Sequence, residues 1–248
     1  MAAIQCTNLS IGYGSTIIQH SLNLSLHEGE MVCMLGRNGC GKSTLLRTLA
    51  GLQAPLGGEY TIMNAPAHAE TMNSQIALVL TERLSVDNTT IHDVVAMGRY
   101  PYTSFLGGLS ELDEEIIAQS LRDVGLYEQM HTFFNDHSDG EKQRVLIAKA
   151  LAQQTPIIFL DEPTAHLDLP NRIHVLRLLH ELANQRGKTI LISTHELDLA
   201  CQFSNRILLM YKDGIQLDTP DNMRANDAFT KAFGMDVFQP LLFSTCCP

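Results

Sequence analysis

A glycine-rich loop, Gly36–Thr44, is the segment of this sequence with the clearest chemistry. Its letters, GRNGCGKST, fit the pattern G-x-x-x-x-G-K-[ST] in full. Glycines let backbone N–H groups turn inward and form a nest for phosphate oxygens, and the following helix would present its N-terminus to the same anion. Lys42 is expected to reach the β- and γ-phosphates, and the Ser43 hydroxyl to bind Mg²⁺. The sequence therefore predicts a nucleotide site made by Gly36, Arg37, Asn38, Gly39, Cys40, Gly41, Lys42, Ser43 and Thr44.

Two carboxylates follow an apolar run of four residues, Ile157–Leu160. Such a run predicts a buried strand, and Asp161 and Glu162 come directly after it. Asp161 suits Mg²⁺ through its water shell, and Glu162 could polarise the water that attacks a γ-phosphate. Alone, the pair could be a solvated strand end. Together with the glycine-rich loop, it predicts that the chain hydrolyses the nucleotide that it binds.

The elements that must position these residues have the pattern of an α/β domain. Met31–Leu35 is apolar throughout, which is typical of a central strand buried on both faces, and Ser43–Ala50 has helical spacing. After residue 155, strands and helices alternate at Ile157–Leu160, Pro170–Arg186, Thr189–Ser193, Glu196–Phe203 and Arg206–Met210. We therefore expect one domain over residues 1–248, in which the loop joins a buried strand to a helix.

The middle of the chain, from about Ala69 to Thr155, has a different pattern. Glu111–Val124 is spaced as an amphipathic helix, and Lys142–Gln153 is expected to be a second helix. Each is preceded by a capping-box signature, made by Ser110 with Asp113 and by Ser138 with Glu141. We expect this block to be a helical subdomain inserted into the α/β core.

The composition limits the classes of function. The 248 residues carry a formal net charge of −10, which argues against a broad nucleic-acid surface and against polybasic attraction to anionic lipid. The six cysteines have neither zinc spacing nor a disulfide rhythm, so reduced thiols are expected. The apolar runs are too short to span a bilayer, and the first five residues lack the basic and apolar blocks of a signal peptide. We expect a soluble protein made inside the cell, whose membrane association would go through another protein.

Five motifs occur in the order found in the ATP-binding-cassette (ABC) ATPases, and the chain resembles this family over nearly all its length. His137–Glu141, with the letters HSDGE, lies where the family has its Leu-Ser-Gly-Gly-Gln signature, before the carboxylates that resemble its Walker B element. Pro163–Asp168 looks like the segment that leads into the family's D-loop. His195 is similar to its switch histidine, and Tyr13 matches the aromatic residue that stacks on adenine.

The resemblance implies a P-loop NTPase core with an antiparallel β subdomain and a helical insertion subdomain. It also implies ATP and Mg²⁺ as cofactors, with Glu162 and His195 as catalytic residues. In the family two cassettes pair head to tail, so the signature of one, carried here by Ser138 and Gly140, covers the γ-phosphate held by the other. Ser138 as a helix cap supplies a physical reason, because a capped helix N-terminus opposes the phosphate charge.

Two places depart from the family pattern. His137 and Glu141 replace the Leu and Gln of the signature, at its periphery. The family normally has Pro-Gln near residue 81, where the glutamine touches Mg²⁺ and the transporter, but this chain has Thr81, Glu82 and Arg83. Threonine is short for the metal, whereas the Glu82 carboxylate is a hard oxygen ligand. We predict that Glu82 binds Mg²⁺ and takes over the sensing role; a solvated loop is the alternative.

The stretch Gly98–Tyr102, with the letters GRYPY, indicates a branch of the family. It is similar to the Gly-Arg-x-Pro stretch in ATPases of iron-siderophore, haem and cobalamin importers, although a helix ended by Gly98 and Pro101 would give the same letters. In the family this part of the helical subdomain docks on the permease. We expect the ATPase subunit of a bacterial metal-chelate importer. It would be a cytoplasmic homodimer, peripheral on the inner face of the plasma membrane, bound to two permease subunits and served indirectly by a substrate-binding protein.

Three other functions fit parts of the sequence. The ATPase subunit of an exporter would make the match at Gly98–Tyr102 accidental. A soluble cassette protein acting on ribosomes or DNA usually has two cassettes or a long coiled coil. This chain has one cassette and no sustained heptads, so we expect no nucleic-acid partner. A small-molecule P-loop kinase would explain neither the signature nor His195.

Overall fold

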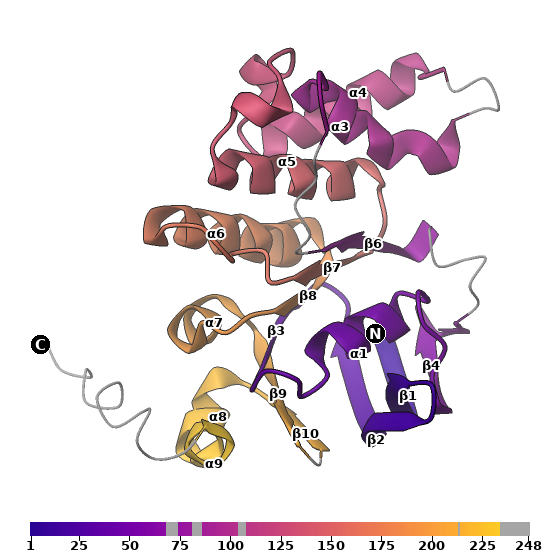
Figure 1. The fold of residues 1–248 in the computed structure, drawn as a ribbon, viewed down its shortest axis with the longest axis vertical. Coiled ribbons are helices and arrows are strands. Elements are labelled where there is room, and N and C mark those ends of the chain that lie inside the picture. Colours follow the sequence, from indigo (N-terminus) through magenta and orange to yellow (C-terminus); the bar gives the residue numbers. More distant parts are fainter. Residues whose placement is uncertain (68–73, 81–85, 104–107, 213, 234–248) are drawn as a thin grey trace, which may run out of the picture.

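A computed structural model describes residues 1–67, 74–80, 86–103, 108–212 and 214–233. Within them the chain forms two β-sheets and a set of helices that gathers at one end of the molecule (Figure 1). Thr81, Glu82 and Arg83 lie outside the described residues.

The larger sheet carries the chemistry. Its six strands have the spatial order β10 (Gly214–Asp218), β9 (Arg206–Tyr211), β3 (Met31–Gly36), β8 (Thr189–Ser193), β7 (Ile157–Asp161) and β6 (Ile76–Val79). All neighbours are parallel except β10 and β9. Strands β3, β7 and β8 are buried at every residue, as the apolar residues that make up most of each strand predict.

Alternate residues of β3 face two separate cores. Met31, Cys33 and Leu35 belong to one cluster, and Val32 and Met34 belong to the other, because successive side chains of a strand point to opposite faces. The first core is covered by the helices that follow the strands, which are α6 (Leu169–Arg186), α7 (Leu197–Phe203), α8 (Pro220–Ala225) and α9 (Ala228–Phe233).

The second core lies under the smaller sheet. This sheet has four antiparallel strands in the order β2 (Thr16–His27), β1 (Ala2–Tyr13), β4 (Gly57–Ile62) and β5 (Ala65–Pro66). Helix α1 (Lys42–Leu49) packs Leu45, Leu46 and Leu49 into the same core, between the two sheets (Figure 1). The expected antiparallel β subdomain is therefore confirmed.

The helical part follows β6. It contains α3 (Ile91–Ala96), α4 (Glu111–Asp123), α5 (Asp139–Ala152) and the short 3₁₀ helices η1 (Met97–Tyr102), η2 (Tyr127–Gln129) and η3 (Phe134–Asp136). The expected lower boundary near Ala69 is too early, because Ile76–Val79 pairs with β7 and is the edge strand of the larger sheet. A four-residue strand with a distant partner leaves little periodicity in the sequence.

Capping boxes explain where α3, α4 and α5 start. Both predicted capping boxes are present, Ser110 with Asp113 before α4 and Ser138 with Glu141 before α5. Because Ser138 is the N-cap, α5 begins at Asp139, three residues before the predicted start at Lys142. A third capping box, Thr90 with Asp93, starts α3 and was not predicted.

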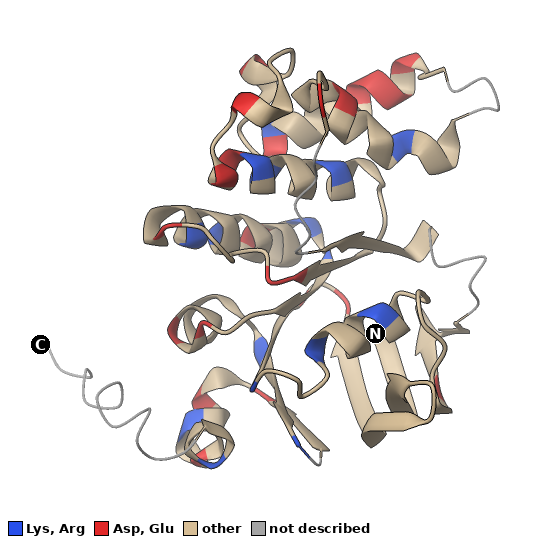
Figure 2. Ribbon diagram, viewed as in Figure 1, with Lys and Arg blue, Asp and Glu red and all other residues tan. Residues whose placement is uncertain are grey.

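Acidic side chains gather along α4 and at the start of α5 (Figure 2). In α4 they include Glu111, Asp113 and Glu114 in the first turn, where negative charge complements the positive end of the helix dipole. In the part of the chain that the structure describes, no helix has the length and apolar character needed to cross a bilayer.

The Gly98–Tyr102 motif is largely internal to the helical part. Arg99 is 4% exposed; its Nε lies 2.7 Å from Asp113 Oδ1, and its Nη1 donates to the carbonyl of Ala152 at 2.8 Å. At Gly98 a Cβ would lie 2.3 Å from the carbonyl oxygen of Lys149, so only glycine allows this approach to α5. Helix α3 ends before Gly98, and the chain continues through Pro101 as a 3₁₀ helix. Arg99 thus ties η1 to α4 and α5.

Replacing Arg99 by glutamine is expected to lower the Tm of the nucleotide-free protein by on the order of 10 °C, because it leaves Asp113 without its buried partner. Circular dichroism would measure it. Hydrogen bonds from Ser110, and then Arg99, hold the pKa of Asp113 at about 2. A lowered pKa stabilises the fold at neutral pH, and this stabilisation is lost as pH falls from about 4 towards 2. The difference in Tm between the wild type and Arg99→Gln should therefore become smaller as pH falls over this range.

The matched control is Arg122→Gln, which breaks the exposed pair of Arg122 with Glu115 on α4. An exposed pair of this kind contributes at most about 1 kcal/mol, so the Tm should stay within about 4 °C of wild type. Equal shifts in the two variants would contradict the role given to Arg99.

Candidate active site

The glycine-rich loop connects β3 to α1 in a conformation that only glycines adopt easily. Gly39 and Gly41 have φ of +78° and +106°, in the left-handed region. At Gly36 a Cβ would lie 2.6 Å from the carbonyl oxygen of Met210. Lys42 is 7% exposed, and its Nζ donates to the carbonyl of Gly36 at 2.9 Å. The ammonium group therefore lies across the loop, at the start of α1.

The carboxyl ends of β3, β7 and β8 meet at one edge of the sheet, which we call the catalytic edge. It brings together Lys42, Ser43, Asp161, Glu162 and His195. The Ser43 hydroxyl donates to Asp161 Oδ1 at 3.1 Å, and the hydroxyl of Ser193 also donates to this oxygen. A hydroxyl and a carboxylate in contact are hard oxygen ligands that suit Mg²⁺, so the residues present fit this metal.

Glu162 is held in an unusual backbone conformation. Its φ is +49°, which a non-glycine residue adopts at an energetic cost. Its N–H donates to the hydroxyl of Ser193 at 2.9 Å and lies 3.1 Å from the Ser193 carbonyl oxygen. Its Oε1 lies 2.7 Å from Nε2 of His195, which follows β8. The carboxylate is thus aimed at the imidazole, and both side chains stay partly exposed.

Ser138 and Gly140 lie at the start of α5. The Ser138 hydroxyl donates to Glu141 Oε2 at 2.7 Å, and this contact and the Ser138 N–H lower the pKa of Glu141. A Cβ at Gly140 would lie 2.6 Å from the side chain of Asn171, so the signature packs against the start of α6. Within the described residues, no hydrogen bond or ion pair joins Ser138 or Gly140 to the loop 36–44.

Comparison with known proteins identifies the family. The sequence pattern of the ABC transporter family matches residues 19–165, more than half of the chain. The chain belongs to the ABC transporter family. This ABC protein is an ATPase: it binds ATP and hydrolyses it to ADP and phosphate.

Similar proteins cover nearly all of this ABC ATPase. The iron(3+)-hydroxamate import ATP-binding protein FhuC of Bacillus subtilis is 33% identical over 234 residues, which cover 90% of this chain and 87% of FhuC. A solved structure described as an inward-facing, metal-chelate type ABC transporter is 30% identical, with a TM-score of 0.84 over 94% of this chain and 89% of that one. The dimeric structure of the cassette MJ0796 is 26% identical, with a TM-score of 0.74 over 88% of this chain and 98% of that one.

Tyr13 lies at the end of β1, beside the start of α1. Its ring is half exposed, and its hydroxyl accepts a hydrogen bond from Thr44 Oγ1 at 3.2 Å. The aromatic ring is therefore open to solvent next to the glycine-rich loop. This placement is compatible with stacking on a base.

Two further side chains contact the glycine-rich loop and the two carboxylates, and the sequence did not reveal them. Gln19 of β2 is buried, and its Nε2 donates to the carbonyls of Cys40 and Tyr211, which fixes the loop against β9. Ser193 holds both Asp161 and Glu162 from the neighbouring strand. Neither contact has a local sequence signal, because the partners are far apart in the chain.

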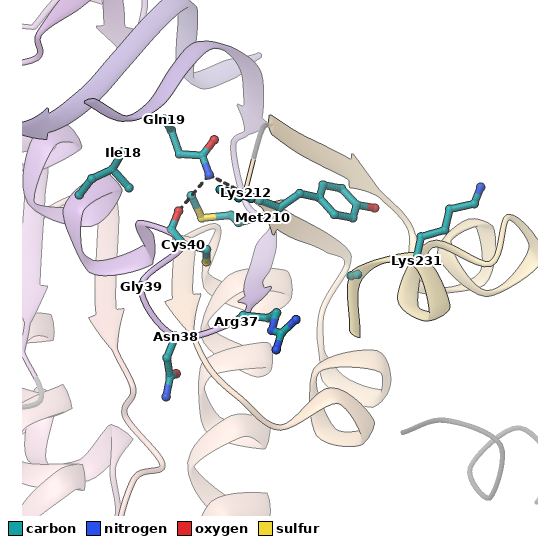
Figure 3. Close-up of a pocket in the computed structure, with 11 residues that line it drawn as sticks. Ile18, Gln19, Arg37, Asn38, Gly39, Cys40, Met210, Lys212 and Lys231 are labelled. Atoms are coloured by element: carbon teal, nitrogen blue, oxygen red, sulfur yellow. Dashed lines mark hydrogen bonds between the residues drawn. The ribbon is translucent and has the colours of Figure 1, made fainter. Parts of the chain in front are cut away.

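A pocket of about 780 Å³ lies beside the glycine-rich loop. Figure 3 shows it bordered by the loop residues 37–40, by Gln19 and by the end of β9, with Lys231 of α9 at its far side. Its lining includes neither Lys42 nor Ser43. The pocket therefore lies outside the catalytic edge.

Proposed function

We propose that this ABC ATPase is the cytoplasmic subunit of a bacterial importer that energises uptake of an iron chelate, haem or cobalamin through a membrane permease. The observation that carries the ATPase site is the catalytic edge, where Lys42, the Ser43–Asp161 pair and the Glu162–His195 pair converge. The likeness to FhuC and to a transporter of metal-chelate type supports the substrate class.

In the proposed mechanism, Lys42 is the counter-charge for the β- and γ-phosphates, and Ser43 and Asp161 would hold Mg²⁺, which neutralises phosphate charge when bound. The Glu162 carboxylate accepts a proton from water as the water oxygen bonds to the γ-phosphorus. The bond from that phosphorus to the bridging oxygen breaks, and ADP leaves. The His195 imidazole orients Glu162 through the contact at 2.7 Å, and its ring would also hold the γ-phosphate in line with the attacking water. Positioning and electrostatics supply most of the rate.

We propose that the active form is a head-to-tail homodimer, in which Ser138 and Gly140 of one chain complete the site of the other. Support comes from Ser138, which caps α5 and, within the described residues, forms its hydrogen bonds with Glu141 and none with the glycine-rich loop of its own chain. It also comes from the dimeric structure of a similar cassette.

Mixing two defective chains tests the shared site. Lys42→Ala and Ser138→Arg homodimers are each expected to be inactive. Each mixed dimer has two sites: one has both wild-type groups and the other has neither. Half of the sites in the mixed dimers are therefore intact, and the mixture should recover part of the turnover. Phosphate release before and after mixing would measure it. Wild-type turnover in either homodimer would contradict the two-chain site, and so would mixed dimers that form without activity.

The exposed part of the helical subdomain is the proposed permease surface. Tyr100 and Tyr102 are 63% and 46% exposed on η1, whereas Gly98 and Arg99 are buried beneath them. We propose that this surface holds the ATPase on the inner face of the plasma membrane, with a substrate-binding protein acting at the other side. Acidic residues along α4 (Figure 2) and the net charge of −10 support the absence of a nucleic-acid partner.

Uptake in cells that lack the chain tests the importer. Accumulation of radioactive iron from ferric siderophores or haem, or of labelled cobalamin, should be lost for one of these substrates and restored by the wild-type gene. Normal uptake of all of them, together with reduced efflux of another compound, would favour an exporter instead.

A further inference from the structure

Arg172, in the first turn of α6, contacts the two loops that flank the catalytic edge. Its Nη1 lies 2.8 Å from Oε1 of Glu196, the residue after His195. Its Nε donates to the carbonyl of Leu167 at 2.6 Å, in the segment that follows Glu162. One planar guanidinium therefore joins the loop after β8 to the loop after β7, with the fork geometry that distinguishes arginine from lysine.

The Glu196 carboxylate is held in place at some cost. Its Oε2 is buried, and the side chain of Thr164, in the segment between Glu162 and Leu167, also stabilises the charged carboxylate. Burial raises the pKa of Glu196, and the charge of Arg172 acts in the opposite direction. A carboxylate that is partly withdrawn from water is favoured where it is paired, so the contact with Arg172 restrains Glu196, and with it the backbone of His195.

These contacts form a closed ring of interactions that includes Glu162 and His195. From Glu162 the chain turns through two backbone hydrogen bonds, Ala165 N–H to the Glu162 carbonyl and Leu167 N–H to the Thr164 carbonyl. Arg172 then bridges from Leu167 to Glu196. The peptide leads back to His195, whose Nε2 lies 2.7 Å from Glu162 Oε1.

We propose that Arg172 and Glu196 are positioning residues for ATP hydrolysis, because their ion pair holds the loop of Glu162 and the loop of His195 in a fixed position relative to each other. The inference rests on the roles proposed above for Glu162 and His195. Neither Arg172 nor Glu196 contacts the glycine-rich loop. The ion pair therefore affects the rate of ATP hydrolysis and leaves the affinity for ATP unchanged.

A double-mutant cycle with Arg172→Gln, Glu196→Gln and the double variant tests the lock. Each single variant is expected to lower kcat about tenfold with the Kd for ATP unchanged. The double variant should be no slower than the slower single variant, because both changes break the same link. Arg186→Gln is the control, since it breaks the ion pair with Asp123 at the other end of the same helix; its kcat should match wild type even if its Tm falls.

The His195 ring resonance gives a second readout without nucleotide. It is assigned by its absence in His195→Ala, and it should shift in Arg172→Gln and stay in place in Arg186→Gln. Wild-type kcat in both single variants, or effects that multiply in the double variant, would overturn the proposal, as would an unmoved resonance. Glu162→Gln, assayed in parallel, tests the catalytic roles alone: if it keeps wild-type turnover those roles fail, while the resonance still reports on the lock.

Discussion

Replacing Glu162 by glutamine should slow ATP hydrolysis by about 10²–10⁴-fold, the usual contribution of a general base. Glutamine has nearly the same shape, so it keeps the two backbone hydrogen bonds that hold position 162 against Ser193. It cannot take the proton of the attacking water. ATP affinity should stay near wild type, because Lys42 and the loop glycines are untouched.

The same variant should accumulate as an ATP-bound dimer, because the step that separates the chains follows hydrolysis. Size-exclusion chromatography with ATP would show the dimer, and single-turnover kinetics would give the rate of the chemical step. Glu115→Gln, an exposed carboxylate on α4, is the control and should behave as wild type. Unchanged turnover in Glu162→Gln would remove Glu162 from the role of base. His195→Ala should also slow hydrolysis, since Glu162 loses the partner at 2.7 Å.

Replacing Lys42 by alanine is expected to weaken ATP binding by about 10²–10³-fold. Truncating one partner of a buried charge pair costs about 2–5 kcal/mol, and Lys42 is 7% exposed at the start of α1. Its ammonium donates to the Gly36 carbonyl at 2.9 Å, so the charge lies within the glycine-rich loop, where the phosphates are proposed to bind.

A fluorescent ATP analogue measures this affinity directly. Thermal shift offers a second measurement, because saturating ATP stabilises only a protein that binds it. The control Lys231→Ala removes the same charge from an exposed position of α9, where Nζ contacts the carbonyl of Asn226, and should leave affinity within about twofold. If Lys42→Ala binds as tightly as wild type, the phosphate site lies elsewhere.

Local patterns in the sequence predicted the central strands and the capping boxes of α4 and α5, although α5 starts three residues before its predicted start. β3 and β7 contain the apolar runs Met31–Leu35 and Ile157–Leu160, and the capping boxes of Ser110 and Ser138 need only residues three apart. The predicted strand Thr189–Ser193 is confirmed with the same bounds. The order of the motifs also placed Lys42, Asp161, Glu162 and His195 in one family-wide arrangement, and the structure brings them to one edge.

Contacts between residues that are distant in the chain could not be predicted from local sequence patterns. The edge strand β6 is recognisable only by its pairing with β7. Arg99 was singled out as part of a docking motif, yet its guanidinium is buried against Asp113 and the end of α5. No local sequence pattern marks Gln19, Ser193 or Arg172. Each contacts residues that are distant in the sequence and that the fold brings near. Glu82, predicted to bind Mg²⁺, lies outside the described residues and stays a prediction.

The position of β3 in the larger sheet has a consequence for the chain during its synthesis. β3 is made early, but its two neighbours, β8 and β9, come from residues 189–211. At a translation rate of about 5–20 residues per second, roughly 9–35 s separate the end of β3 from the end of β9. Until then β3 is an apolar strand without its two neighbours on the ribosome-bound chain, and the nucleotide site that follows it is incomplete. Nucleotide can therefore stabilise only chains that are nearly complete, and fragments that end before β9 are left to aggregation or degradation.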